Sequence, residues 1–374
     1  MILRKSLAGL AVALLAGAAV ACGGSGGGGH GHGGHGGKGD GGSWAPLAKG
    51  QAAQVLDFSA GGRDAGTRQV AFYGFSGSPA GLTTAADGSV YGLGQKLIRL
   101  EPDRKVAVVT AASDAEDRVS GVVALPDGSL VVGVGSQVKK IAPGGVTTVL
   151  AGAAGAARAS GAPVPASAAA AGFSFAATPS PVGVGRDGAV LITDEDVLWS
   201  LDNGTLKRLY RITGKGPDAL PLRLGPESAV DGSGTAYLTP EELGPRVPGL
   251  LEDVLAVSPD GVLSKPLVPA RIAGLPGAAA KLNVRWLAGD GADGVFAQVY
   301  DPSGGNGAVV HLHAGRADLV AHENEGAGAA KPCRIPKPVD ALHLPCPLPG
   351  AMAYRSGSLF LGGLTDYVLQ IRVS

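Results

Sequence analysis

The stretches GLTTAADGSVYGLG (residues 81–94), GVVALPDGSLVVGVG (121–135) and PVGVGRDGAVLITD (181–194) decide the fold of this chain. In each of them a short apolar run reaches an Asp-Gly turn, and a second apolar run follows at once. This pattern predicts a β-hairpin, because glycine tolerates the positive φ that such tight turns require. Three more divergent copies begin at Glu227, Val284 and Ala351. Six copies of one hairpin unit indicate a repeat architecture.

Each copy has room for four short strands. In the second copy we expect them at 121–125, 129–134, 137–141 and 146–150. These strands are runs of Val, Leu and Ile without clean alternation, which is typical of sheets that bury both faces. Such a sheet cannot bury itself alone, so the copies must stack around an axis. The sequence therefore predicts an all-β fold, a six-bladed β-propeller of four-stranded antiparallel blades, over residues 68–374.

The two ends of this domain are expected to meet in one blade. The segment Tyr367–Val373 is the predicted third strand of the sixth copy, and no residues follow it to form the fourth. Upstream of the first copy, Gln69–Tyr73 (QVAFY) has the composition of a strand. We predict that this N-terminal strand pairs with Tyr367–Val373 and closes the ring, which would leave no exposed edge between blades. Residues 44–67 would then form an irregular lead-in.

The N-terminus carries a targeting signal. A positive start is followed by an apolar stretch at residues 7–21, which is shorter than the about 20 residues that a membrane-spanning helix needs. It ends in Ala19-Val20-Ala21-Cys22, which resembles a bacterial lipobox, where the cysteine is lipidated and begins the mature protein. The resemblance implies a signal peptide at 1–21 and a lipoprotein anchored to the cell membrane outside the cytoplasm. An ordinary secretory signal cut after Ala21 is the alternative.

Residues 22–43 are expected to be a flexible tether. Fourteen of the twenty residues from Gly23 to Gly42 are glycine, and such a segment cannot bury enough apolar area to become ordered. The tether also contains His30, His32 and His35, and imidazole is a good ligand for zinc, copper or nickel. A polar spacer and a metal-binding tether are both compatible with this composition, and the lack of a scaffold favours the spacer.

The charge balance limits the classes of partner that we expect. The 31 basic and 31 acidic residues leave no net charge, and we see no basic stripe with interleaved aromatic residues, so nucleic acid is excluded as an expected partner. We expect a monomer.

Besides Cys22 the chain has Cys333 and Cys346, which outside the cytoplasm should form a disulfide. A metal site made of this pair and His343 is the alternative, but it matches no usual zinc spacing.

One segment carries a family resemblance. The stretch TTVLAGAAGAARASGAPVPASAAAAGFSFAATPSPVGVGRDGAVLITDEDVLWSLDNGTLKRL (147–209) resembles the NHL-repeat family of β-propellers. It has a "TVAG"-like strand, a Gly/Ala-rich loop, "P-x-G-V", an Asp-Gly turn and a strand that ends in Asp. The family's aspartate at that position is Asp194 here, but Gly94 and Gly135 replace it in the first two copies. A function that rests on a regular ring of aspartates is therefore in doubt.

Loop lengths distinguish the two faces of the predicted ring. Connections between the first and second strands of a blade, and between its third and fourth, lie on one face and are short. All long inserts lie on the other face, which we call the long-loop face: 151–180, 213–226, 240–251, 274–283 and 322–350. Long loops on one side of a rigid scaffold are where binding surfaces are usually found. Acidic residues expected there are the ligand-face candidates: Asp194, Glu195, Glu227, Glu241, Asp301 and Asp366.

These residues leave two function classes open. The first is a non-catalytic propeller that binds a protein, glycan or cell-wall ligand on the long-loop face. The second is a metal-dependent hydrolase or lyase with calcium in the central channel, as the senescence-marker and gluconolactonase propellers use for lactone hydrolysis. Only Glu227 is expected at the axis, and calcium prefers six to eight oxygen ligands. His311 and His313 share one side of a strand, which suits a structural pair better than a metal site. We identify no catalytic residues, which favours the first class.

Overall fold

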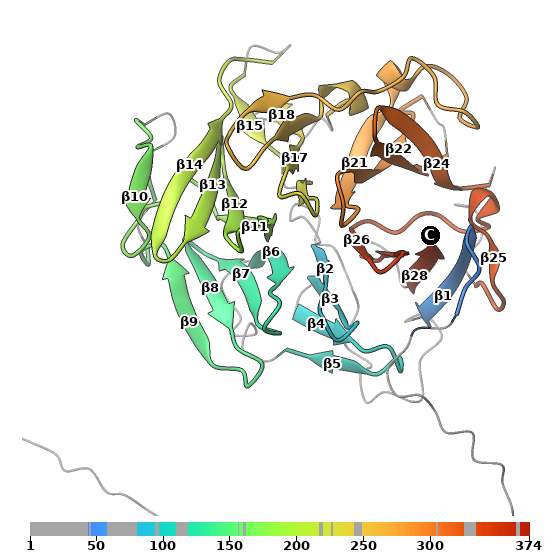
Figure 1. Ribbon diagram of the computed structural model, residues 1–374, viewed down its shortest axis with the longest axis horizontal. Helices are drawn as coiled ribbons and strands as arrows, with labels where there is room; N and C mark the ends of the chain where they lie inside the picture. Colours follow the sequence, from blue (N-terminus) through green and yellow to red (C-terminus); the bar gives the residue numbers. More distant parts are fainter. Residues whose placement is uncertain are drawn as a thin grey trace, which may run out of the picture. The chain divides into compact units, whose positions relative to one another are not determined.

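The computed structural model describes residues 44, 46–57, 81–93, 97–109, 119–155, 157–159, 162–216, 220–225, 227–242, 249–303, 306–324, 334–363 and 367–374. All of them belong to the unit formed by residues 41–374. This unit is a ring of six antiparallel sheets around a central axis (Figure 1). The structure thus confirms the all-β, six-bladed propeller.

The blades follow one another along the chain. Blade 1 contains β2 (Leu82–Thr84), β3 (Val90–Leu93), β4 (Leu97–Leu100) and β5 (Val106–Val108). Blade 2 contains β6 (Val119–Ala124), β7 (Leu130–Val134), β8 (Gln137–Ile141) and β9 (Thr147–Ala151). Blade 3 contains β11 (Ser180–Val184), β12 (Val190–Asp194), β13 (Val197–Asp202) and β14 (Thr205–Arg211), with β10 (Ser167–Ala169) added outside β14. Blades 4 and 5 contain β16 (Ala229–Val230), β17 (Ala236–Leu238), β19 (Leu255–Val257) and β20 (Leu263–Ser264); and β21 (Asn283–Gly289), β22 (Val295–Tyr300), β23 (Ala308–His313) and β24 (Arg316–His322).

Blade 6 contains strands from both ends of the chain. They are β26 (Met352–Arg355), β27 (Ser358–Leu361), β28 (Tyr367–Arg372), β1 (Gln51–Asp57) and the short β25 (Val339–Asp340). Outside the blades, β15 (Leu222–Leu224) pairs with β18 (Pro240–Glu242). The described residues also include the short 3-10 helices η2 (Leu251–Asp253), η3 (Ala279–Lys281) and η5 (Ala341–His343).

The Asp-Gly turns form as the sequence predicts. In blade 2 the Asp127 carboxylate accepts a hydrogen bond of 2.9 Å from the Ser129 amide. Gly128 has a φ of 80°, a conformation that is strained for residues with a Cβ atom. The turn brings β7 back antiparallel to β6. The same Asx geometry recurs at Asp87 and Asp187, so the local sequence builds these hairpins.

The core lies between neighbouring blades. All five residues of β12 are buried, because side chains on both faces of this sheet pack against other blades or against the inserts. One cluster joins residues of blades 5 and 6, and another joins those of blades 4 and 5. Burial on both faces explains why the strands lack the alternation of a half-exposed sheet.

An N-terminal strand closes the ring, but it is not the one that the sequence indicated. Strand β1 (Gln51–Asp57) pairs antiparallel with β28, beside which it lies in Figure 1. Gln69–Tyr73 lies outside the described residues, and the edge of β28 that it was expected to occupy is taken by β1. The expected irregular lead-in at 44–67 is therefore wrong for 51–57. Val55 is 3% exposed in the core between blades 6 and 1, and this burial favours β1 in the closing position.

The signal peptide, Cys22 and the His-rich tether lie outside the described residues, and the lipoprotein assignment remains an expectation. Within the described part of the chain, we find no helix with the length and apolarity needed to span a membrane.

Candidate functional site

Two of the long inserts are joined to each other at one end of the blades. The strand order in each sheet places the connections between blades, and those between second and third strands, at this end. Here β15 of the insert 213–226 pairs with β18 of the insert 240–251. The Leu224 amide at the end of β15 donates a 2.7 Å hydrogen bond to the Glu195 carbonyl of blade 3. These two inserts and the end of blade 3 are therefore connected on the long-loop face.

Asp194 fixes the insert 151–180. Its side chain is fully buried, and its Oδ1 accepts hydrogen bonds of 2.8 Å from the amides of both Ala176 and Ala177. Its Oδ2 lies 3.4 Å from Nη2 of Arg158. Burial raises the pKa of Asp194, and the two amides and Arg158 offset this effect only in part. The NHL-like aspartate thus anchors a loop from within, and it does not project from the surface as a ligand-face residue would.

Arg158 extends this network within the same insert. Its Nη1 donates to the Ala162 carbonyl at 3.2 Å, and its side chain is 10% exposed. Next to it, Asp196 accepts a 2.6 Å charged hydrogen bond from Nε of Arg211 on β14. Phe175, from the same insert, is fully buried. Polar and apolar contacts together hold this insert against blade 3.

Glu323 has the corresponding role in the insert 322–350, and the sequence did not single it out. Its Oε2 accepts a hydrogen bond of 2.9 Å from the Gly307 amide, and its Oε1 accepts one of 2.5 Å from the Leu348 amide. The Tyr367 hydroxyl donates to the Pro347 carbonyl nearby. A glutamate after an outer strand carries no distinctive sequence signal, because its partners come from distant parts of the chain.

Glu241, another ligand-face candidate, is also tied into the structure. It is 3% exposed and forms an ion pair of 3.2 Å with Arg223 across the β15–β18 ladder. Burial raises the pKa of Glu241, and Arg223 opposes this shift. Asp301 accepts hydrogen bonds from the amide and hydroxyl of Ser303 in its own turn, and these bonds lower its pKa.

Asp366 and Cys333, two further positions that the sequence indicated, lie outside the described residues. Cys346 is described and is 1% exposed. The disulfide between Cys333 and Cys346 therefore remains a prediction.

The two histidines each have a carboxylate partner. His311 Nε2 lies 2.8 Å from Asp290 Oδ2, and His313 Nε2 lies 2.8 Å from Asp318 Oδ2. Burial of Asp290 favours its neutral form, but hydrogen bonds from His311 and two amides outweigh it and lower the pKa of Asp290. The two imidazole rings stack with centroids 4.2 Å apart. Their surroundings are those of a structural pair, and no third ligand converges on them within the described residues.

The innermost strands surround the axis of the ring (Figure 1), and the cavities along this axis form a central channel. Its end towards the long-loop face, which we call the channel mouth, is a cavity of about 60 Å³. A second cavity of about 230 Å³ continues towards the short turns. Both are lined by residues of the inner strands, among them Leu82, Val122 and Leu287. The inner strands approach closely, since a Cβ on Gly121 would lie 2.3 Å from the Pro181 carbonyl oxygen.

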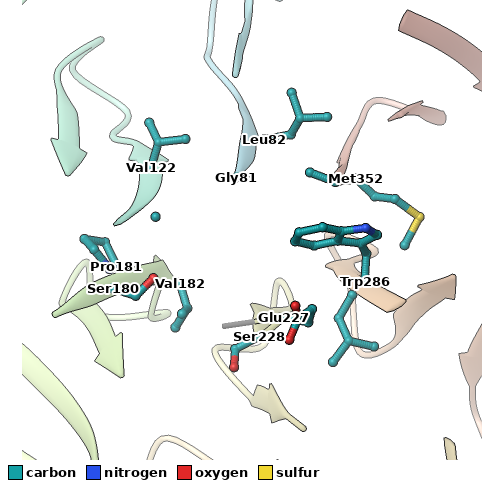
Figure 2. Close-up of a pocket in the computed structure, with 13 residues that line it drawn as sticks. Gly81, Leu82, Val122, Ser180, Pro181, Val182, Glu227, Ser228, Trp286 and Met352 are labelled. Atoms are coloured by element: carbon teal, nitrogen blue, oxygen red, sulfur yellow. The ribbon is translucent and has the colours of Figure 1, made fainter. Parts of the chain in front are cut away.

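Glu227 is the sequence-predicted residue that the structure places on the axis. It is 5% exposed and is the one carboxylate among the described residues that line the two cavities. Figure 2 shows the indole ring of Trp286 extending into the same mouth, beside Met352 and next to Glu227. Trp286 and Met352 were not predicted from the sequence. Trp286 is the fourth residue of the inner strand β21 and Met352 is the first residue of β26, so the strand bounds could have indicated them.

The described residues contain no group of three or more His, Cys, Asp or Glu side chains that could hold a metal ion. The candidate site therefore consists of the fixed loops of the long-loop face and, at their centre, a mouth with one carboxylate, one indole and one thioether.

Comparisons with known proteins identify similar structures but do not assign the chain to a family. No protein-family model and no curated protein matches the sequence, so the NHL relationship remains a resemblance. Among solved structures, the chain is similar to a gluconolactonase from Xanthomonas campestris, with 15% identity, a TM-score of 0.46, and 80% of this chain and 87% of that chain covered. It is also similar to a structural-genomics target named for the gluconolactonases (12%, TM-score 0.47, 88% and 93% covered). A puromycin hydrolase mutant is similar as well (13%, 0.39, 76% and 50%). None of these similarities carries an argument about the activity of this chain.

Proposed function

We propose that this protein is a lipid-anchored, extracytoplasmic propeller that binds a protein, glycan or cell-wall ligand on its long-loop face without catalysing a reaction. The observation that carries the proposal is the fixation of the two longest inserts by two carboxylates, Asp194, which is fully buried, and Glu323, which is partly buried. Burying a carboxylate is costly unless hydrogen bonds and opposite charges compensate it. Loops ordered in advance lose less entropy when a partner binds. Such loops suit recognition.

The anchor in this proposal rests on Ala19-Val20-Ala21-Cys22 and on the glycine-rich segment that follows. Cys22→Ser should release the protein from the membrane fraction or leave it as an unprocessed precursor. Unchanged fractionation of this variant would contradict lipidation at Cys22.

Ligand binding on the long-loop face can be tested by photo-crosslinking in intact cells. A photoreactive residue at Leu342, which is 38% exposed on the insert 322–350, should give a discrete adduct. The same residue at Asn203, in an exposed short turn of blade 3, is the matched control and should give none. Excess purified wild-type protein should compete with the Leu342 adduct. Adducts from both positions, or from Asn203 alone, would contradict the proposal.

A metal-dependent hydrolase or lyase is the second candidate, because Glu227 lines the channel where an axial cation would sit. Side chains outside the described residues, or backbone carbonyls, would have to complete its ligand set. The two functions differ in their response to a chelator. Binding predicts that EDTA leaves the thermal midpoint and the Leu342 adduct unchanged. A hydrolase of this type predicts a lower midpoint that added calcium or zinc restores.

A further inference from the structure

We propose that the channel mouth receives a primary ammonium group of the ligand, such as the end of a lysine side chain or of another aminoalkyl group. This inference rests on the proposed function, since it names the chemistry that the long-loop face would recognise at its centre. It starts from three side chains that line one cavity: Glu227, Trp286 and Met352.

Glu227 provides the negative charge. It is 5% exposed, and the other residues that line the mouth are uncharged. Glu227 has other interactions within the protein. A carboxylate offers about four acceptor positions, so it can accept a ligand N–H beside those interactions. A cation placed here would lie in a site of low dielectric, where attraction to a carboxylate is stronger than in water.

Trp286 and Met352 favour an organic cation. The indole ring extends into the mouth in Figure 2, and an aromatic face attracts an ammonium group, most strongly when the ring is that of tryptophan. The Met352 thioether is soft and polarizable, and it suits the methylene groups that carry an ammonium. A hydrated metal ion would gain little from either side chain, because hard cations prefer oxygen ligands.

The size and polarity of the mouth further restrict the chemical groups that it can bind. A volume of about 60 Å³ admits a slender ammonium head, whereas a guanidinium is a wider planar fork that needs several acceptors. A sugar ring would need many polar side chains. The Ser228 hydroxyl is already engaged, since it donates a 2.8 Å hydrogen bond to the Gly225 carbonyl.

The ammonium group would enter from the long-loop face. The mouth is lined by residues that precede the inner strands, such as Gly81 and Glu227, and by residues within these strands, such as Gly121. These residues follow the connections that lead into each blade. A ligand held by the inserts is therefore next to the mouth.

The test is a titration of the detergent-solubilised full chain with n-butylamine, followed by calorimetry and by chemical shifts of the indole protons. The matched probes are n-butanol, which lacks the charge, and n-butylguanidinium, which has a wider head. We expect n-butylamine to bind at least about tenfold more tightly than either probe. Glu227→Gln should weaken amine binding at least about tenfold, and Trp286→Phe should weaken it about threefold. Glu252→Gln, which alters an exposed glutamate away from the channel, should change nothing.

Equal binding of n-butylamine and n-butanol to the wild type would overturn the inference, even if Glu227→Gln failed to fold. Unchanged amine affinity in a folded Glu227→Gln variant would also overturn it, as would calcium binding that depends on Glu227 without any amine binding. The proposed function has a separate readout. A Leu342 adduct without amine binding contradicts this inference alone, and amine binding without a Leu342 adduct contradicts the proposed function alone.

Discussion

Two aspartates on opposite faces of the ring, Asp127 and Asp194, have different structural roles. On the short-turn face, Asp127 accepts a hydrogen bond from its own turn and pairs with Lys140 at 2.8 Å, while its side chain stays 55% exposed. On the long-loop face, Asp194 is fully buried and binds amides that lie 17 and 18 residues away in the sequence. The first aspartate stabilises a local hairpin, and the second orders a long insert.

This difference shows that some stabilising contacts order a loop and do not contribute to the ring itself. Ordering a residue costs about 1 to 2 kcal/mol of backbone entropy, so a long insert stays ordered only if specific contacts offset that cost. A two-residue turn has little entropy to lose and needs no buried charge. We infer that Asp194 holds the insert 151–180 in place, whereas Asp127 stabilises the hairpin turn in which it lies.

Removing the closing strand should have the largest effect, because both faces depend on an intact ring. Deletion of residues 1–57 removes β1 and leaves an edge of β28 unpaired. We expect the loss of a cooperative thermal transition and of near-UV circular dichroism. Deletion of residues 1–43 ends before Trp44 and should leave the transition unchanged. A cooperative transition at the wild-type midpoint after the longer deletion would show that β1 does not close the ring.

Asp194→Ala should have the next largest effect. It removes two hydrogen bonds to backbone amides and one partner of the buried Arg158, and we expect a loss of about 3 kcal/mol in the free energy of unfolding. Asp127→Ala is the matched change on the short-turn face and should cost less than about 1 kcal/mol, since its ion pair is exposed. Urea denaturation of both variants measures the two values. Similar losses would remove the distinction between the faces.

A smaller effect is the pH dependence of the same pair. Burial raises the pKa of Asp194 above 3.8, so the pH-dependent part of its contribution to stability is fully present below pH 3.8 and is lost as pH rises through the folded-state value. The hydrogen bond with Lys140 and that with the Ser129 amide lower the pKa of Asp127 from 3.8 to about 2. Its contribution is therefore complete above pH 3.8 and is lost as pH falls towards 2.

Urea denaturation at several pH values checks this contrast. The free energy of unfolding of the wild type minus that of Asp194→Asn should decrease as pH rises. The corresponding difference for Asp127→Asn should increase with pH over the acid range. Slopes of the same sign would be inconsistent with the opposite environments of the two carboxylates.

The ring was predictable because its signals are local. An Asp-Gly turn such as Asp127-Gly128 determines a hairpin from a few neighbouring residues, and six copies determine the architecture. The closing strand was placed wrongly because QAAQVLD (51–57) carries only a weak strand signal. Its burial depends on contacts with blades 6 and 1 and with the insert at Ile335, whose amide donates to the Gln54 side chain. Such contacts are not visible in the sequence.

The site was predictable only in part, for a similar reason. Glu227 could be placed on the axis because it lies two residues before an inner strand. The role of Asp194 could not be predicted, since its partners are amides of Ala176 and Ala177 whose position depends on the path of the insert. Trp286 looked like another core residue of a strand. The side-chain chemistry was visible in the sequence, but which groups would meet was not.

The most direct test of an ordered long-loop face is hydrogen exchange, read by mass spectrometry on peptides that cover residues 173–179. We predict that the Ala176 and Ala177 amides are protected in the wild type and lose this protection in Asp194→Ala, while peptides from β12 and β13 stay protected in both. Exchange of the 173–179 peptides in the wild type as fast as that of the exposed turn at residues 143–145 would contradict the account.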